Sequence, residues 1–173
     1  MYKAEEEDAG FYPLSSPGSG DAFGITVGVD PDESGPFTEF LRDLAAGDTV
    51  EIAGPFGRNF YEGESRVVVL AGGPGVGPAV GIGEAAVADD NEVAVVYRAD
   101  APAPPERLDA LREAGASVAV TDSDIADHVA AAITDGPDEQ VFVYGFEEFI
   151  DDATAALDAA GTDPDAAKAE NFG

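Results

Sequence analysis

The sequence VVVLAGGPGVGPA, residues Val67–Ala79, passes from an apolar run through a turn into a helix. It opens with four consecutive aliphatic residues, three of them β-branched, which is typical of a strand buried on both faces in a parallel sheet. Four glycines and two prolines follow within the seven residues 72–78, too dense for a regular element. From Ala79 onward the composition favours a helix. Strand, glycine-rich turn and helix in this order bring backbone N–H groups and a helix N-terminus toward a phosphate.

This glycine turn has two interpretations. In one, the glycines let a pyrophosphate approach the main chain without meeting a Cβ atom. In the other, residues 72–78 form a tight strand-to-helix turn that holds no ligand. The spacing is not the G-x-G-x-x-G of the usual dinucleotide fingerprint, so the turn alone leaves both interpretations open.

Strands and helices alternate regularly after Gly63. Strands are expected at 66–71, 93–97, 117–120 and 141–144, and helices at 79–88, 105–114, 125–133 and 149–159. Gly115 and Gly161 stand where helix C-termini are expected. The alternation predicts a Rossmann-like parallel α/β domain with helices on both faces of the sheet. Ligands of such sheets bind beyond the strand carboxyl ends, where the glycine turn and residues 144–146 fall.

Residues 1–62 follow a different pattern. Apolar residues alternate with small or polar ones, which predicts half-buried strands. Strands are expected at 11–14, 23–29 and 50–52, the first at an edge or bulge because of Pro13, and a short helix is expected at 37–44. This part is therefore predicted to be a small antiparallel β-barrel or sheet.

The chain carries 36 acidic and eight basic residues, a net charge of -28. Such self-repulsion destabilises a compact state at low salt. Molar salt shortens the Debye length to about 3 Å and removes most of the penalty. The acids are spread along the whole chain, which favours a surface adapted to a salty cytoplasm over an acidic interaction arm. We expect no nucleic-acid partner, because little here would neutralise phosphates.

Cysteine is absent and His128 is the single histidine. This excludes disulfides, thiolate zinc sites, cysteine-held iron–sulfur clusters and a cysteine nucleophile, and we expect no metal site. His128 is interpreted as a surface or boundary residue of a helix. A secretory leader pattern is lacking, and the longest apolar run is shorter than the roughly 20 residues that span a bilayer. We expect a soluble, cytoplasmic protein without a membrane partner.

Six segments, in order, resemble the ferredoxin–NADP reductase family, in which a flavin-binding barrel precedes a nicotinamide-nucleotide domain. They are YPLSS (12–16), GPFTEFL (35–41), GDTVEIAGPFG (47–57), AGGPGVGP (71–78), VYGF (143–146) and ENF (170–172). The resemblance covers most of the chain. It implies an oxidoreductase that passes hydride and electrons between a nicotinamide nucleotide and FAD, with an unidentified acceptor such as a ferredoxin. It also implies a partial FAD-binding barrel over 1–62 and an NAD(P)-binding domain over 63–173.

The resemblance assigns roles to individual residues. Flavin contacts fall to Tyr12, Leu14, Ser15, Ser16, Gly35 and Thr38, with Phe172 covering the ring. Arg58 is one of the few cations of the chain, and it is a further candidate to meet a flavin phosphate. Contacts to the nicotinamide nucleotide fall to Gly72, Gly73, Gly75, Val76, Gly77, Pro78, Tyr144 and Gly145. The catalytic candidates are Tyr144, beside the nicotinamide, and Glu170, as a proton relay or electrostatic partner.

These assignments have structural alternatives. Tyr12 and Tyr144 are equally interpretable as core aromatics, and Ser15 with Ser16 as an ST-turn before a proline. Glu170 is also one acid among 36. Phe172 is alternatively a frayed terminus. A non-enzymatic nucleotide-binding regulatory or interaction module that has lost its flavin is the alternative function.

The chain also departs from the family pattern. Gly10 stands where the motif arginine would neutralise a flavin phosphate, Pro13 replaces the motif serine, and Tyr144 and Phe146 replace a cysteine and a proline. The family's first barrel strands have no counterpart here. We therefore expect this chain to bind FAD weakly unless upstream strands are added. We also expect exposed sheet edges that oligomerisation could cover.

Acids near the expected nucleotide site predict NADH in preference to NADPH. Asp122 and Asp124 follow the third strand of the α/β pattern, and Asp100 follows the second. Their charges would repel a 2′-phosphate, although salt softens the effect. Arg98 is the cation that could reverse this preference.

Overall fold

The computed structural model describes residues 12–18, 21–27, 35–100 and 105–172. A five-stranded parallel sheet with the strand order β3-β2-β1-β4-β5 forms its centre. Its strands are β1 (Arg66–Gly72), β2 (Glu92–Arg98), β3 (Ser117–Thr121), β4 (Glu139–Gly145) and β5 (Lys168–Asn171). Every residue of β1 after the first is buried, so this central strand needs cover on both faces.

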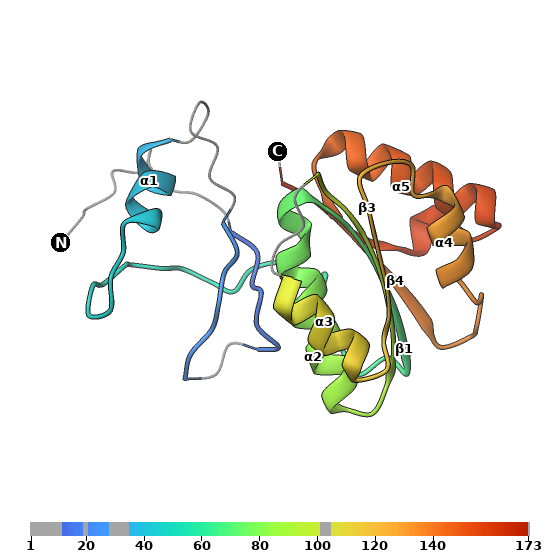
Figure 1. Ribbon diagram of the computed structural model, residues 1–173, viewed down its shortest axis with the longest axis horizontal. Helices are drawn as coiled ribbons and strands as arrows, with labels where there is room; N and C mark the ends of the chain where they lie inside the picture. The colour runs from blue at the N-terminus through green and yellow to red at the C-terminus, as the bar shows by residue number, and fades with distance from the viewer. Residues whose placement is uncertain (1–11, 19–20, 28–34, 101–104, 173) are drawn as a thin grey trace.

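Two pairs of helices provide that cover (Figure 1). The helices α2 (Val76–Ala88) and α3 (Pro105–Glu113) lie on the sheet face turned toward the N-terminal part, and α4 (Ala126–Ala132) and α5 (Glu147–Ala160) lie on the other face. Alternate residues of β1 serve the two faces: Val67 and Val69 join one apolar core, and Val68 and Leu70 join the other. The predicted parallel sheet with helices on both faces is confirmed. No helix in the described ranges has the length and apolar character that a bilayer span requires.

Several element bounds differ from the predictions, and one strand was not predicted. The helix α2 begins at Val76, after a short 3-10 turn (Gly73–Gly75), and not at Ala79. Pro78 is compatible with this start because residues of the first helical turn need no N–H donor. The helix α5 begins at Glu147, and a second 3-10 turn (Pro164–Ala166) follows it. The fifth strand, β5, was not predicted, because its sequence KAEN is polar and short and only its pairing with β4 makes it a strand.

The described part of residues 12–62 contains one helix, α1 (Pro36–Arg42), and no strand. A single antiparallel bridge joins Leu14 to Ile25. The strands expected at 11–14, 23–29 and 50–52 are therefore wrong for the residues described, and the barrel is not confirmed. A β-strand forms only where its backbone N–H and C=O groups hydrogen-bond to those of a neighbouring strand. Without them Ile52 is left 63% exposed. Val29 and residues 1–11 lie outside the described ranges.

The segment 59–64 joins the N-terminal part to the edge strand β5. The Asn59 side-chain amide donates to the carbonyl of Ala169 at 2.7 Å. Lys168 pairs with Glu62 at 2.8 Å and with Glu64 at 2.9 Å. Burial pushes the pKa of Lys168 down, but these hydrogen bonds outweigh it, so the pKa is raised and the ammonium stays charged. The connection to the sheet edge is thus made by polar contacts.

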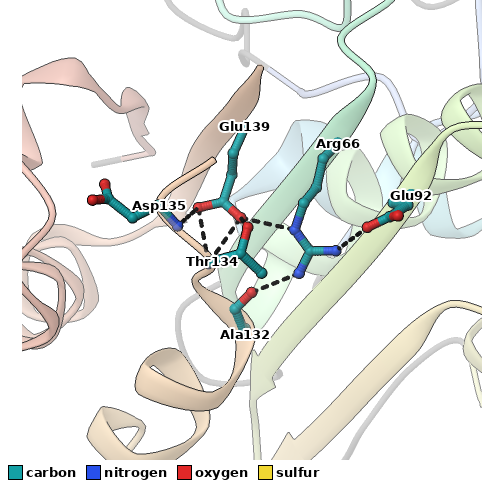
Figure 2. Close-up of polar contacts among 6 residues, drawn as sticks. All are labelled: Arg66, Glu92, Ala132, Thr134, Asp135 and Glu139. Carbon is teal, nitrogen blue, oxygen red and sulfur yellow. Dashed lines mark hydrogen bonds and ion pairs between the residues drawn. The ribbon is translucent and has the colours of Figure 1, made fainter. Parts of the chain in front are cut away.

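An arginine-centred network lies at the amino ends of the central strands (Figure 2). Arg66, the first residue of β1, donates to Glu139 of β4 at 2.8 Å, to Glu92 of β2 at 2.7 Å and to the carbonyl of Ala132 at 2.8 Å. Because the three strands are parallel, this network joins their starts. The carboxyl ends of these strands lie on the opposite side of the sheet, at the other end of each strand.

Candidate functional site

The candidate site is at the carboxyl ends of β1 and β4, which are neighbours in the sheet. The chain leaves β1 toward α2 on one face and leaves β4 toward α5 on the other. A crevice outside the strand ends forms at such a topological switch point, where ligands of parallel α/β sheets bind. Gly72 ends β1 and Gly145 ends β4, so two predicted site residues meet at this point.

Protein packing explains two glycines of the turn, Gly72 and Gly75, and also Gly145 at the end of β4. A Cβ atom on Gly72 would lie 2.4 Å from Cγ of Phe149, and one on Gly145 would lie 2.7 Å from Cδ1 of the same ring. A Cβ atom on Gly75 would lie 2.2 Å from the carbonyl oxygen of Tyr144. These three glycines are needed for α5 and β4 to pack closely on the turn. Their presence alone therefore does not require a ligand.

Gly73 is different, because its outward side is open. It is exposed, its φ is +52°, and a Cβ atom there would meet no atom within 4 Å. The 13-residue helix α2 begins three residues later at Val76. Gly73 thus leaves its main chain accessible just before a long helix N-terminus, and these residues fit the pyrophosphate of a dinucleotide. Val76 and Pro78 are buried in the first turn of α2 and position this turn.

Aromatic rings are stacked beside the switch point. Phe142 and Tyr144 of β4 lie 6.4 Å apart between ring centroids, and Tyr144 and Phe172 also lie 6.4 Å apart. Phe146, which follows β4 and precedes α5, meets Phe172 edge-on at 6.3 Å between ring centroids. The Phe172 N–H donates to the carbonyl of Gly145 at 3.1 Å, so this residue is anchored to the site and not frayed.

The two catalytic candidates are cross-strand partners, since Tyr144 of β4 is in register with Glu170 of β5. Tyr144 is buried and its hydroxyl donates to the carbonyl of Asn59, a placement that fits the core-aromatic alternative. Burial and then the charge of Glu170 raise its pKa. Glu170 is half-buried, and burial raises its pKa too. Within the described part of the chain its carboxylate has no hydrogen-bond partner, which suits an acid that exchanges a proton.

Three of the predicted flavin residues come together around α1. The Tyr12 hydroxyl and the Thr38 hydroxyl lie 3.2 Å apart, and the Tyr12 ring lies 6.0 Å from that of Phe37. Gly35 is the residue before α1. Tyr12 is half-buried, so part of its ring is accessible. Leu14 lies in the bridge to Ile25.

Ser15 and Ser16 lie against α2, behind the glycine turn. Ser15 is only 2% exposed, and its carbonyl accepts from Arg107 of α3. The Ser16 hydroxyl donates to the carbonyl of Gly18 at 2.8 Å and accepts the N–H of Gly24 at 3.2 Å. This local use of the hydroxyl fits a turn-forming role. A Cβ atom on Gly77 would lie 3.3 Å from that of Ser15, so the predicted flavin segment touches the predicted nucleotide helix.

Arg58 is the described cation with no ion pair, while the other arginines and Lys168 in the described ranges each pair with an acid. Arg58 is exposed and so is open to an anion. His128 is half-buried on α4, in keeping with a boundary residue. Sequence reasoning assigned no role to Phe146, although an aromatic directly after the glycine that ends a strand is a usable signal. Nothing in the sequence pointed to Asn59, whose carbonyl holds Tyr144.

Comparison with solved structures identifies the fold. The FAD/NAD-binding domain of nitric oxide dioxygenase from Vibrio cholerae matches with a TM-score of 0.75 and 21% identity, over 94% of this chain and 76% of that one. The ferredoxin reductase in carbazole 1,9a-dioxygenase matches with a TM-score of 0.69 and 20% identity, over 94% of this chain and 55% of that one. The chain has the ferredoxin reductase fold. The resemblance predicted from the sequence is thereby confirmed at the level of the fold.

The chain is also similar in sequence to an electron transfer subunit. The probable dihydroorotate dehydrogenase B (NAD(+)) electron transfer subunit of Methanopyrus kandleri is 44% identical over 69 residues. That match spans 39% of this chain and 25% of the relative. No family model matches the chain.

Proposed function

We propose that this protein is a ferredoxin reductase-like flavoprotein that passes electrons between a nicotinamide nucleotide and FAD. The observation that carries the proposal is the open glycine turn at the β1–β4 switch point, with the segment of predicted flavin residues packed on the helix that follows it. The names of the similar proteins, which include FAD/NAD-binding domains and an electron transfer subunit, support the same chemistry. In this proposal residues 1–62 serve the flavin and residues 63–173 the nicotinamide nucleotide.

When bound, the nicotinamide supplies a hydride and the flavin accepts it. The chain's own residues bind and orient the two groups. The turn around Gly73 would hold the pyrophosphate, and Tyr12, Thr38 and Arg58 would hold the flavin. Phe172 and the half-exposed Phe146 would exclude water from the rings.

The two polar groups near these rings, Tyr144 and Glu170, have separate roles. Tyr144 keeps its proton and positions the end of β4. Glu170, with its raised pKa, is the group that would hold or release a proton next to the site.

NADH is the proposed nucleotide, because Arg98 is already neutralised. Its guanidinium donates to Asp152 at 2.6 Å and lies 5.1 Å above the ring of Phe149. The exposed acids Asp122 and Asp124 follow β3. A 2′-phosphate at this edge would therefore meet carboxylates with no free arginine beside them. The proposed setting is a salt-rich cytoplasm, and the proposed acceptor is a redox protein or a catalytic subunit.

The test is titration of the purified chain with NADH and NADPH in the same molar KCl, followed by anaerobic NADH addition with excess FAD. We expect NADH to bind more tightly than NADPH and to bleach the flavin absorbance. Two variants probe the turn. Gly73→Asp places a negative charge toward the phosphates, and Gly73→Asn is its neutral match with similar tolerance of positive φ.

Weaker NADH binding by Gly73→Asp than by Gly73→Asn would support the assigned site. Equal binding by the two variants, or no NADH binding by the native chain, would contradict it. NADH binding without flavin reduction would favour the non-enzymatic nucleotide-binding module. The absence of strands in the described part of residues 12–62 is the observation in favour of that alternative.

A further inference from the structure

One stripe of α2 faces the N-terminal part. Gly77, Gly81 and Glu84 are spaced at i, i+4 and i+7, so they lie on the same side of the helix. Figure 1 shows α2 and α3 on the sheet face turned toward that part. The glycine turn immediately precedes the same helix. One rigid element therefore carries both the candidate nucleotide turn and a surface for the described residues 15–18 and 21–26.

The two glycines of the stripe bring this segment close to the helix. A Cβ atom on Gly77 would lie 3.1 Å from Cβ of Thr26. A Cβ atom on Gly81 would lie 2.9 Å from the carbonyl oxygen of Ser16. A side chain at Gly81 would thus meet backbone, which yields less readily than the end of a side chain. The segment is seated on α2 at a distance that only glycine allows.

Arg107 of α3 adds hydrogen bonds between α2 and Ser15. Its Nε and Nη2 atoms donate to the two carboxylate oxygens of Glu84, each at 2.7 Å. Nη2 also donates to the carbonyl of Ser15. The N–H of Ser15 donates to the carbonyl of Gly24 at 2.8 Å. The planar guanidinium therefore connects α2, α3 and the bridged segment at once, a geometry that lysine cannot reproduce.

We propose that Arg107 and Glu84 form a latch that fixes residues 15–18 and 21–26 on α2 and so sets the position of the flavin segment relative to the glycine turn. Both are positioning residues, because neither lies at the strand ends where the reacting rings are placed. This proposal rests on the proposed function. Hydride transfer depends steeply on geometry, since a misplacement of about 1 Å can cost about 100-fold in rate.

Arg112 provides a matched control on the same helix. It also pairs with a carboxylate, Asp109, at 2.6 Å and also donates to a carbonyl, that of Val118, at 3.3 Å. Its partners belong to α3 and β3, so it does not touch residues 15–18 and 21–26. Arg107→Ala and Arg112→Ala remove the same charge and the same kinds of contact.

The first measurement needs no cofactor. Amide hydrogen exchange of the full chain in molar KCl should show the Ser15 and Gly24 amides exchanging about tenfold faster or more in Arg107→Ala, since about 1.4 kcal/mol of lost protection is tenfold. Arg112→Ala should match the native chain at these amides. Equal exchange in the native chain, Arg107→Ala and Arg112→Ala would overturn the latch.

The second measurement separates the latch from the proposed function. Arg107→Ala should slow flavin reduction by NADH by about 10- to 100-fold while the Kd for NADH stays unchanged. Gly81→Ala, which keeps every charge, should slow it similarly, and Arg107→Lys should restore it only in part. Faster exchange at Ser15 without slower flavin reduction would overturn the positioning role. A native chain that binds no NADH would instead contradict the proposed function, and the exchange data would still decide on the latch.

Discussion

Glu139 has the most buried carboxylate of any ion pair in the described ranges, with a side chain 3% exposed. It accepts hydrogen bonds from Arg66, from the hydroxyl and N–H of Thr134, and from the N–H of Asp135. Burial pushes its pKa up, but these bonds outweigh it, so the pKa lies below its ordinary value of 4.5. Glu92, the other acid on Arg66, is 74% exposed and makes one bond to it.

We expect Glu139→Gln to lower the free energy of unfolding by about 2–3 kcal/mol at pH 7, because buried hydrogen bonds to a charge are lost and the exposed Glu92 is then the one acid that Arg66 still pairs with. Glu92→Gln should cost less than about 1 kcal/mol. A folded-state pKa below the unfolded one stabilises at all pH values above the unfolded pKa, and this stabilisation is lost as the pH falls through the folded pKa. The difference in the free energy of unfolding between the native chain and Glu139→Gln should therefore shrink below about pH 4.5.

Urea unfolding of the three proteins at fixed salt, at neutral pH and in acid, makes this measurement. Equal losses for Glu139→Gln and Glu92→Gln would contradict the burial argument. A gap that widened in acid would contradict the sign of the pKa shift.

At the scale of an element, the glycine turn combines two positions that disfavour a side chain for different reasons. Gly75 faces the backbone of β4, where the Tyr144 carbonyl leaves 2.2 Å for a Cβ atom. Gly73 faces open space but needs a φ of +52°. The turn is thus rigid on its inner side and bare on its outer side.

Gly75→Ala should destabilise the protein by about 3 kcal/mol or more, since a central strand would have to move. Gly73→Ala should cost about 1–2 kcal/mol, the cost of a left-handed conformation for a residue with a Cβ atom. Thermal and urea unfolding of both variants at the same salt would show the difference. Gly75→Ala as stable as Gly73→Ala would mean that β4 does not constrain the turn.

For the whole molecule, we expect the net charge of -28 to determine how stability depends on salt. Raising KCl from about 0.1 M to about 1 M shortens the Debye length from about 10 Å to about 3 Å. The melting temperature should therefore rise, and a gain of about 3 kcal/mol corresponds to about 6–12 °C for a chain of this size. Asp151→Asn with Asp158→Asn, at exposed positions of α5, should raise the melting temperature at low salt and reduce its salt dependence. A melting temperature insensitive to salt would refute this account.

Local patterns were enough to predict β1 to β4 and the helices between them. Runs of buried aliphatic residues, helical spacing and glycines after helices act over a few neighbouring residues, so each could be recognised alone. The same signals placed the glycine turn and Tyr144 at the strand carboxyl ends. They failed for 23–29 and 50–52, because alternation marks a strand only where a partner strand exists.

Contacts between distant residues were decided by the tertiary structure alone. The polar segment KAEN became β5 by pairing with β4, and the buried Tyr144 hydroxyl found its acceptor in the carbonyl of Asn59, 85 residues away. Phe149 made Gly72 and Gly145 necessary, and Arg107 reached Ser15 across 92 residues. Such partners are set by how whole elements pack, since a long separation in sequence carries no local signal of which surfaces will meet.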